Sequence, residues 1–151
     1  MIIGIGIDIL SLTRFRNLLS RRDPLRLAKK ICTEREYESF KALSITRSND
    51  ISEIEGGKNE SQLVDQQIRF LSCRWTLKEA AYKSLSMQIH PLRWQDLDIS
   101  HSISGAPILF PTNQSHRVKF TLLGSLSHDA DVVVGVVIAQ LNNSKSDSND
   151  K

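Results

Sequence analysis

Isoleucine alternates with glycine and one aspartate at the start of the chain, over residues 3–9. Successive side chains of a strand point to opposite faces, so the four isoleucines would share one face, and Gly4, Gly6 and Asp8 the other. This apolar run predicts a buried N-terminal strand whose isoleucines face the core. The glycine face would leave room for a group to lie against the backbone, with Asp8 at its edge.

Helical patterns follow this strand, and further strand patterns come last. Ser11 is a typical N-cap, and Thr33 with Glu36 forms a capping-box pattern at the start of another helix. A longer helix is expected over residues 63–86, and strands over residues 97–100, 118–126 and 132–139, the last two joined as a hairpin at 128–131. Helices first and strands later predict a single α+β domain with a small, largely antiparallel sheet.

Two stretches lack large apolar side chains. Residues 44–62 are rich in Ser, Asn, Glu and Gly and predict a flexible insertion within the domain. Residues 142–151 are polar and predict a disordered tail, which leaves residues 1–141 as the folded domain.

The charge balance excludes some classes of partner. A formal net charge of +3 in 151 residues is too small to indicate nucleic-acid binding, but it suits an anionic small molecule or an acidic protein through local patches. The chain has no apolar run of about 18 residues, so no membrane span is expected. Cys32 and Cys73 have no Cys-x-x-Cys partner, and the simplest interpretation is two reduced, buried thiols.

Two carboxylates stand in apolar or cationic surroundings. Glu79 and Lys83 are four residues apart and would share a helix face. Surface ion pairs would explain Glu79, and a helix cap would explain Asp8. The alternative is a Mg²⁺ site, because Mg²⁺ takes one or two protein carboxylates and fills its other positions with water and substrate phosphate. His128, after Ser127, is either a structural histidine or a donor to a phosphate.

Short motifs along nearly the whole chain occur in the order of one enzyme family. They lie at residues 4–9, 14–15, 31–36, 74–83, 94–99, 104–107 and 125–128. The central motif reads Arg-Trp-x-x-Lys-Glu-Ala-x-x-Lys, and the last reads Ser-Leu-Ser-His. Together they resemble the holo-acyl-carrier-protein synthase type of 4′-phosphopantetheinyl transferase. Each motif alone is weak, and their common order and spacing make the resemblance specific.

The resemblance implies transfer of 4′-phosphopantetheine from coenzyme A to a serine of apo-acyl carrier protein, with release of adenosine 3′,5′-bisphosphate. Asp8 and Glu79 would hold Mg²⁺ against the pyrophosphate, and Lys83 would neutralise the phosphate under attack. The resemblance also implies contacts with coenzyme A from Arg74, Lys78, Gly105, Pro107 and His128. An acidic carrier protein would dock on Arg14, Arg21, Arg22 and Arg26, and the chain would form a homotrimer with active sites between subunits.

The chain departs from the family pattern in places. Ala106 stands where the turn usually carries Lys, and the insertion and the tail are longer than in compact bacterial members. These features suggest a eukaryotic, mitochondrial relative, with a cytoplasmic location as the alternative. A noncatalytic module that binds coenzyme A or a carrier protein is the second functional hypothesis. A small RNA-binding protein is the third hypothesis, but this chain lacks the interleaving of aromatic and basic residues expected of such a protein.

Overall fold

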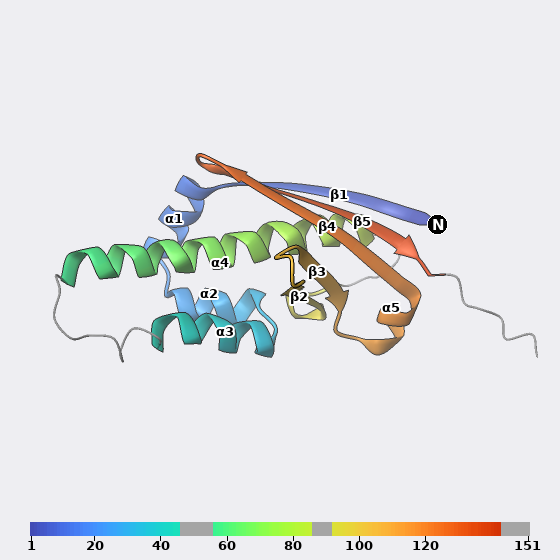
Figure 1. Ribbon diagram of the computed structural model, residues 1–151, viewed down its shortest axis with the longest axis horizontal. Helices are drawn as coiled ribbons and strands as arrows, with labels where there is room; N and C mark the ends of the chain where they lie inside the picture. The colour runs from blue at the N-terminus through green and yellow to red at the C-terminus, as the bar shows by residue number, and fades with distance from the viewer. Residues whose placement is uncertain (46–55, 86–91, 143–151) are drawn as a thin grey trace, which may run out of the picture.

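The computed structural model describes residues 1–45, 56–85 and 92–142. Its central element is the helix α4 (Gly56–Leu85), which lies between a sheet and a pair of shorter helices (Figure 1). The sheet has five strands in the order β1-β5-β4-β3-β2, and each neighbouring pair is antiparallel. The predicted α+β class with an antiparallel sheet is therefore confirmed.

The predicted elements occur in the expected order, and the structure adds the strand β3 and the short helix α5, which the sequence analysis did not predict. The strands are β1 (Ile2–Ser11), β2 (Leu97–His101), β3 (Pro107–Pro111), β4 (Phe120–Asp129) and β5 (Val132–Leu141). The helices besides α4 are α1 (Leu12–Ser20), α2 (Pro24–Ile31), α3 (Glu34–Ile45), the 3-10 turn η1 (Trp94–Asp96) and α5 (Gln114–Lys119). The ends of β4 and β5 meet in a hairpin, as expected.

The helix starts agree with the capping signals. The Ser11 side chain accepts a hydrogen bond from the Arg14 backbone N–H at 3.2 Å and begins α1. Thr33 and Glu36 form the reciprocal pair of a capping box: the Thr33 N–H donates to Glu36 Oε2 at 2.9 Å, and the Glu36 N–H donates to Thr33 Oγ1 at 3.3 Å. The helix α1 has a second cap from the β4–β5 hairpin, because the Asp131 carboxylate accepts a hydrogen bond from the Thr13 N–H at 2.7 Å.

Some boundaries differ from the sequence-based expectation. The helix α4 begins at Gly56, before the expected start at residue 63, and α3 extends to Ile45, so part of the predicted insertion is helical. Residues 46–55, most of the tail and the predicted helix end at residues 86–91 lie outside the described residues. The short helix α5 includes residues 118 and 119, where the strand of residues 118–126 was expected to begin. Asn113 caps this helix by accepting a hydrogen bond from the Ser115 N–H at 2.9 Å.

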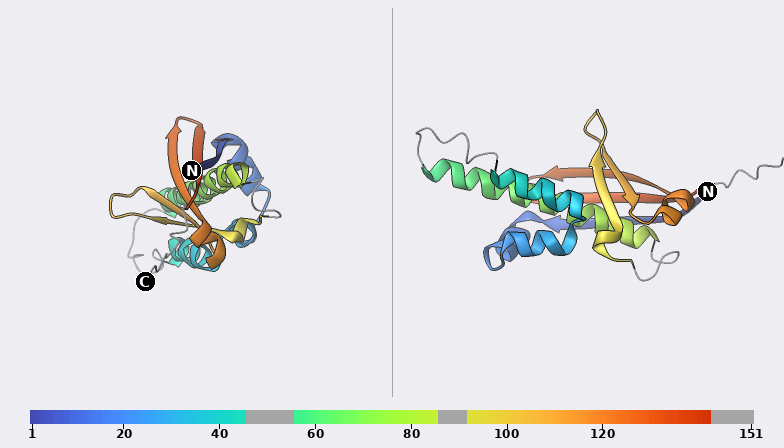
Figure 2. Two further views of the ribbon diagram at one scale, coloured as in Figure 1. Left: turned by 90° about the vertical axis from the view of Figure 1, so that its right-hand side faces the viewer. Right: turned by 90° about the horizontal axis from the view of Figure 1, so that it is seen from below.

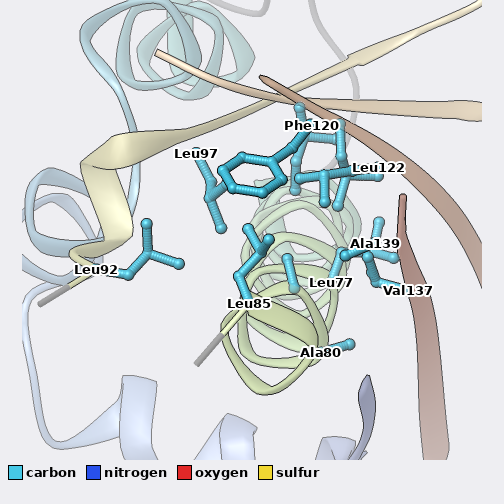
Figure 3. Close-up of a cluster of buried hydrophobic side chains, with 12 residues drawn as sticks. Leu77, Ala80, Leu85, Leu92, Leu97, Phe120, Leu122, Val137 and Ala139 are labelled. Atoms are coloured by element: carbon cyan, nitrogen blue, oxygen red, sulfur yellow. The ribbon is translucent and has the colours of Figure 1, made fainter. Parts of the chain in front are cut away.

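The hydrophobic core has two parts on different stretches of α4. One lies between the C-terminal half of α4 and the sheet, with Leu77, Leu85, Phe120 and Val137 among its members (Figure 3). The other joins α1, α2 and α3 to the N-terminal half of α4 through Phe15, Ile31, Phe40 and Leu71. The two further views show α2 and α3 on one side of α4 and the strands β1, β4 and β5 on the other (Figure 2). Among the described helices, none is long and apolar enough to cross a membrane.

The predicted alternation of β1 is present, but its two faces are reversed. The glycine face packs on α4: a Cβ added at Gly4 would overlap the Ser84 carbonyl, and one at Gly6 would overlap the Ala80 carbonyl. The isoleucine face is open, with Ile5, Ile7 and Ile9 each more than half exposed at 60%, 57% and 68%. The expectation of an isoleucine core face is therefore wrong for the single chain, because glycine allows the helix backbone to approach where a side chain could not.

Candidate active site

Three predicted catalytic residues meet where β1 crosses α4, and we call Asp8, Glu79 and Lys83 the open cluster. Asp8 lies opposite Gly135 in the sheet, on the face of β1 that packs against α4. The Lys83 ammonium donates to Asp8 Oδ1 at 2.8 Å and to the Ile7 carbonyl at 2.9 Å. Residues more than seventy positions apart in the sequence are thus joined by a direct ion pair.

Glu79 lies one helical turn before Lys83 and is half-buried. Burial raises the pKa of its carboxyl group above the ordinary value, the negative charge of Asp8 raises it further, and Lys83 partly opposes both effects. Two carboxylates that repel each other in this way form a site that favours a cation.

The donor set of the open cluster suits Mg²⁺, because both predicted ligands offer carboxylate oxygens and neither a sulfur nor an imidazole ligand is involved. Among the described residues, no group of three or more His, Cys, Asp or Glu side chains could hold a metal ion. Asp8 and Glu79 remain as a pair of carboxylates, which is a number of protein ligands typical of Mg²⁺ bound together with a phosphate.

A cleft of about 490 Å³ adjoins this cluster. Asp8 and Glu79 lie on one side of it, and Arg14, Phe15 and Trp75 are among the residues that line the rest. Arg14 is exposed on α1, so a positive charge lines the same cleft as the two carboxylates. Lys83 does not line the cleft, but it lies beside it through its ion pair with Asp8.

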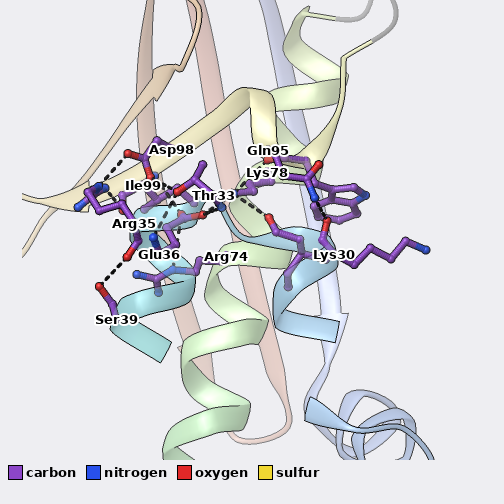
Figure 4. Close-up of polar contacts among 12 residues, drawn as sticks. Lys30, Thr33, Arg35, Glu36, Ser39, Arg74, Lys78, Gln95, Asp98 and Ile99 are labelled. Carbon is purple, nitrogen blue, oxygen red and sulfur yellow. Dashed lines mark hydrogen bonds and ion pairs between the residues drawn. The ribbon is translucent and has the colours of Figure 1, made fainter. Parts of the chain in front are cut away.

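Lys78 does not belong to this cleft, although it precedes Glu79 in the sequence. Its side chain is 1% exposed, and its ammonium donates to the Ile31 carbonyl at 2.8 Å, to Glu36 Oε2 at 2.5 Å and to the Trp94 carbonyl at 3.0 Å (Figure 4). An ammonium has three donors, and all three are used within the protein. The Lys78 ammonium is thus occupied by acceptors of its own chain, although Lys78 also lines a small pocket of about 210 Å³ with Glu79, and its predicted contact with coenzyme A stays a prediction.

Lys78 is part of a second polar group, which we call the buried cluster: Glu36, Arg74, Lys78 and Asp98. The Glu36 carboxylate also accepts from the Ile99 N–H at 3.1 Å, and the Arg74 Nε lies 3.5 Å from its Oε1. Asp98 joins the group through Thr33, whose hydroxyl donates to its carboxylate at 2.8 Å. Desolvation lowers the pKa of the Lys78 ammonium, and Glu36 opposes this effect.

Three of the predicted coenzyme A contacts line a separate cavity of about 150 Å³. Arg74 approaches it from α4, while Gly105 and Pro107 approach from the β2–β3 turn. Gly105 has a φ of +84°, a conformation that favours glycine in this turn. Arg74 lies with its guanidinium 3.4 Å from the centre of the Phe70 ring, and its Nε forms no hydrogen bond.

The same cavity contains His101, which sequence reasoning passed over as a loop residue. It ends β2, and its cross-strand partner is Pro107. The signal that could have found it is the alternation of residues 97–101 followed by a turn, which pairs His101 with Pro107 once that turn closes a hairpin.

His128 does not line this cavity, although its neighbour on the same face of β4, Leu126, does. It is exposed near the tip of the β4–β5 hairpin, opposite Val133. The predicted phosphate contact of His128 is therefore not brought next to Arg74, Gly105 and Pro107 within one chain, and it stays a prediction.

The predicted docking arginines gather around the junction of α1 and α2. Arg21, Arg22 and Arg26 surround a hollow of about 510 Å³ together with Lys30 and Asp23. All four cationic side chains are exposed, and among the described residues none of them forms an ion pair. Arg14 lies apart from this group, at the cleft of the open cluster.

The cysteines are both free thiols, as expected. Cys32 is buried, and burial raises its pKa to about 12, so it stays protonated and inert. Cys73 is only partly buried and lines the cavity near Arg74, which corrects the expectation of two buried thiols.

Comparison with known proteins gives the same family along almost the whole chain. Residues 4–137 match the family model of the 4′-phosphopantetheinyl transferase superfamily. A holo-[acyl-carrier-protein] synthase of Streptococcus sanguinis is 34% identical over 142 residues, covering 94% of this chain and 98% of the relative. One from Streptococcus mutans is 32% identical over 143 residues, covering 95% and 99%.

Solved structures share the fold. The holo-ACP synthase of Plasmodium yoelii superposes with a TM-score of 0.68 at 21% identity, covering 95% of this chain and 98% of that one. The enzyme of Bacillus anthracis, in complex with CoA (3′,5′-ADP), superposes with a TM-score of 0.66 at 24% identity, covering 94% and 99%. From the family match and the identity of its relatives, the chain belongs to the 4′-phosphopantetheinyl transferase superfamily and, within it, to the holo-[acyl-carrier-protein] synthase type.

Proposed function

We propose that this protein transfers the 4′-phosphopantetheine group of coenzyme A to a serine hydroxyl of an apo-acyl carrier protein. The serine hydroxyl gives up its proton to a water molecule or a nearby carboxylate, and its oxygen forms the new bond to the β-phosphorus. The bond from that phosphorus to the bridging oxygen breaks, and adenosine 3′,5′-bisphosphate leaves with the bridging oxygen. The observation that carries the proposal is that Asp8 and Glu79 line one cleft, with Lys83 paired to Asp8 beside it, in a chain whose relatives are named for this reaction.

The residues of the open cluster would act mainly by placing charge. Asp8 and Glu79 would hold Mg²⁺, which supplies positive charge beside the diphosphate. Lys83 already lies within 2.8 Å of Asp8, so its ammonium is close to any phosphate bound at the carboxylate pair. Such transfers depend on alignment of the reacting groups and on neutralising charge that builds up on the phosphate oxygens.

The direct test incubates the full chain with coenzyme A, Mg²⁺ and an apo-acyl carrier protein, and follows the carrier by mass spectrometry. We expect the carrier to gain one phosphopantetheine group, and a carrier whose serine is replaced by alanine to gain none. Chelation of the divalent ion should stop the transfer. Binding of coenzyme A in calorimetry without any transfer would instead support a noncatalytic binding module.

The basic hollow at the junction of α1 and α2 would receive the carrier protein, since carriers of this type are acidic. The exposed side chains of Arg21, Arg22 and Arg26 supply the positive field, and the hollow lies on the same helical region as Arg14 at the cleft. Reversing the charge of Arg21 and Arg22 to Glu should raise KM for the carrier and reduce its salt dependence, with KM for coenzyme A unchanged. Reversal of Arg117 and Lys119 to Glu, an equal charge change at two exposed positions of α5, is the control.

The cavity lined by Arg74, Gly105 and Pro107 would hold the nucleotide part of coenzyme A. It lies on another face of α4 than the open cluster, because five residues separate Arg74 from Glu79 on the helix, a rotation of roughly 140°. A neighbouring subunit that brought its own cavity next to this open cluster would complete the site. A homotrimer with active sites between subunits is the arrangement that we propose.

The outer face of the sheet supports this assembly. Ile5, Ile7 and Ile9 are exposed there, and their cross-strand partners on β5 are Ile138, Val136 and Val134. Leu123 of β4 extends the same apolar surface and is 50% exposed. An apolar surface over three strands favours burial against another protein surface. Ile7→Glu should give monomers in light-scattering measurements and abolish transfer. If the variant instead has the same molar mass as the wild-type assembly, this interface is rejected.

The mitochondrial location stays a prediction from the sequence. We propose it on the polar composition of residues 44–62 and of the tail alone. Fractionation of cells that express the full chain with a C-terminal tag would decide between mitochondria and cytoplasm.

A further inference from the structure

The buried cluster joins four parts of the fold to a single point on α4. The Lys78 ammonium binds the last carbonyl of α2 at Ile31, the carboxylate of Glu36 in the first turn of α3, and the first carbonyl of η1 at Trp94. Glu36 in turn accepts from the Ile99 N–H of β2. Figure 4 shows this convergence, with Lys78 and Glu36 enclosed between the helices and β2.

Stability alone is a weak reason for such an arrangement. Removing two charges from water is costly, and a buried ion pair is often no more stable than a pair of apolar side chains of the same volume. The side chains of Lys78 and Glu36 are each only 1% exposed, so this desolvation applies in full. The cluster also leaves the buried Arg74 Nε without a hydrogen bond, which adds a further cost.

Geometry offers a better reason. On its other side, α4 rests on the glycines of β1, whose missing side chains allow close approach of the helix backbone. Contacts of this kind fix the distance between helix and strand, but they do not set the rotation of the helix. Apolar side chains of α4 such as Leu77 and Leu85 restrain that rotation by packing, and Lys78 adds a directional restraint, because three acceptors from three elements hold one point on the circumference of the helix.

The rotation of α4 decides where the open cluster lies. Glu79 follows Lys78 by one residue, about 100° around the helix, and Lys83 lies one turn beyond Glu79. With Lys78 held toward α2 and α3, Glu79 comes near enough to Asp8 to feel its charge, and Lys83 bonds to Asp8. A helix turned by a fraction of a residue would carry both groups away from β1.

We propose that Lys78 and Glu36 are positioning residues for the open cluster: their buried ion pair fixes the rotation of α4 and thereby places Glu79 and Lys83 against Asp8. This inference rests on the proposed transferase function only for its activity readout. The position of the two carboxylates relative to each other can be measured separately, through their affinity for a divalent ion.

The test compares two variants that each remove buried polar contacts. Lys78→Met with Glu36→Gln removes the charge pair and its hold on α4 while keeping side chains of similar size. Arg35→Met is the matched control: it removes the ion pair of Arg35 with Asp98 at 2.9 Å and a hydrogen bond to the Ile99 carbonyl, contacts that join α3 to β2 without touching α4. Mn²⁺ binding is followed by its electron paramagnetic resonance signal, and folding by thermal denaturation.

We expect the double variant to fold, to bind Mn²⁺ at least about tenfold more weakly and to lose about 10²-fold in kcat, because supporting residues around a metal site have effects of this size. KM for the carrier should not change, since the basic hollow is intact. Arg35→Met should lose thermal stability while keeping wild-type Mn²⁺ affinity and kcat. If the double variant does not fold, Glu36→Gln alone should show the same losses to a smaller degree.

Wild-type Mn²⁺ affinity and kcat in the folded Lys78 and Glu36 variant would overturn the proposal. Losses in Arg35→Met that match those of the double variant would also overturn it, because they would show a general effect of stability. A wild-type protein that binds Mn²⁺ but transfers nothing would reject the proposed function, and the Mn²⁺ affinities would still decide the positioning role. If the wild-type protein does not bind Mn²⁺, Asp8 and Glu79 do not form a site for a divalent ion. That result would overturn the proposal that Lys78 and Glu36 position such a site.

Discussion

Two polar clusters share the helix α4, and adjacent residues of one motif belong to different clusters. Lys78 is enclosed with three acceptors in the buried cluster, whereas Glu79 is half-buried beside a cleft in the open cluster. Among the described residues, Glu79 accepts no hydrogen bond and instead faces the negative charge of Asp8. Lys78 is satisfied within the fold, whereas the Glu79 carboxylate is available to a ligand.

The difference shows that residue type is a poor guide to the role of a charge. Both clusters contain carboxylates and lysines, and both contribute to the same ten-residue motif. Helix geometry separates them, because a step of one residue turns a side chain by about 100°. Loss of a group in the open cluster should therefore reduce transfer directly. In the buried cluster, loss of Asp98 should reduce stability, whereas loss of Lys78 and Glu36 should reduce transfer through the placement of Glu79; four experiments test the division between direct and indirect effects.

The largest effect is expected from the carboxylates of the open cluster. Asp8→Asn and Glu79→Gln should each reduce transfer at least about 10³-fold, since loss of a metal ligand removes several kcal/mol of charge stabilisation. Both variants should stay folded by circular dichroism. Asp65→Asn removes an exposed carboxylate of α4 that pairs with Arg16 at 2.8 Å, and it should keep full activity. Near-wild-type transfer by either site variant would refute the metal assignment.

A single methyl group at Gly6 should move α4 away from β1 and so separate Asp8 from Glu79 and Lys83 within the open cluster. The Cβ of Gly6→Ala would overlap the Ala80 carbonyl, a backbone atom that moves only with the helix. We expect a loss of about 3 kcal/mol in the free energy of unfolding and a large loss of transfer, as in overpacked cores. Urea denaturation measures the first, and the carrier assay the second.

Gly105→Ala is the comparison for this substitution. Its Cβ would meet open space, and only the φ of +84° opposes it, so a smaller loss of about 1 kcal/mol is expected. Equal stability losses at the two glycines would mean that α4 and β1 are not held as closely as the structure shows.

In the buried cluster, Asp98 should affect stability and not chemistry. It accepts from the Thr33 hydroxyl at 2.8 Å and from Arg35 Nε at 2.9 Å, and it is 7% exposed. Asp98→Asn should cost about 1–3 kcal/mol in the free energy of unfolding, because the buried Asp98 side chain loses the charge that its hydrogen bonds with Thr33 and Arg35 satisfy. Transfer per folded molecule should be unchanged. Asp129→Asn, at the exposed hairpin, should change neither, and a selective loss of kcat at Asp98 would break the division between clusters.

The smallest effect concerns the stability cost of the open cluster. Burial and then Asp8 raise the pKa of Glu79, so the folded state binds this proton more tightly than the unfolded state does. The contribution of Glu79 to the free energy of unfolding is therefore fully present below the ordinary pKa of glutamate. It is lost as the pH rises through the raised pKa of Glu79 in the folded state. Glu79→Gln should therefore slightly raise Tm near neutral pH and leave it unchanged in acid, where the wild-type side chain is protonated too.

The control for this pH profile is Glu38→Gln. Glu38 is exposed and forms an ion pair with Lys41 at 2.6 Å, so its loss should leave Tm unchanged or slightly lower near neutral pH. A fall in Tm for Glu79→Gln near neutral pH would show that Glu79 stabilises the fold, contrary to the open character of its cluster.

Local signals in the sequence predicted most of the secondary structure. Ser11, the pair Thr33 and Glu36, and the hairpin near Ala130 act through neighbours a few residues away, so the local sequence is sufficient. The order of elements likewise led to the α+β class. The short helix α5 was missed, because residues 114–117 are polar and carry no helical apolar pattern, and Val118 was assigned to the strand that in the structure begins at Phe120.

The candidate site was predicted in part. The motif at residues 74–83 named Glu79 and Lys83, and the strand pattern named Asp8, but the same motif also suggested Lys78 as a ligand. Whether a lysine is exposed depends on which elements surround it, and the carbonyls of Ile31 and Trp94 are not adjacent to Lys78 in the sequence. His101 was missed for the same reason, since the turn that brings it beside Pro107 follows it.

The sequence by itself determined which segments of this protein become helices and strands, and which residues carry the family chemistry, because both depend on short-range patterns. Only the tertiary structure decided which face of β1 is covered and which of two neighbouring residues, Lys78 or Glu79, stays open to a ligand. The physical reason is that burial depends on distant partners. The glycines of β1 accept the backbone of α4, and α2, α3 and η1 close around Lys78 while leaving Glu79 beside Asp8.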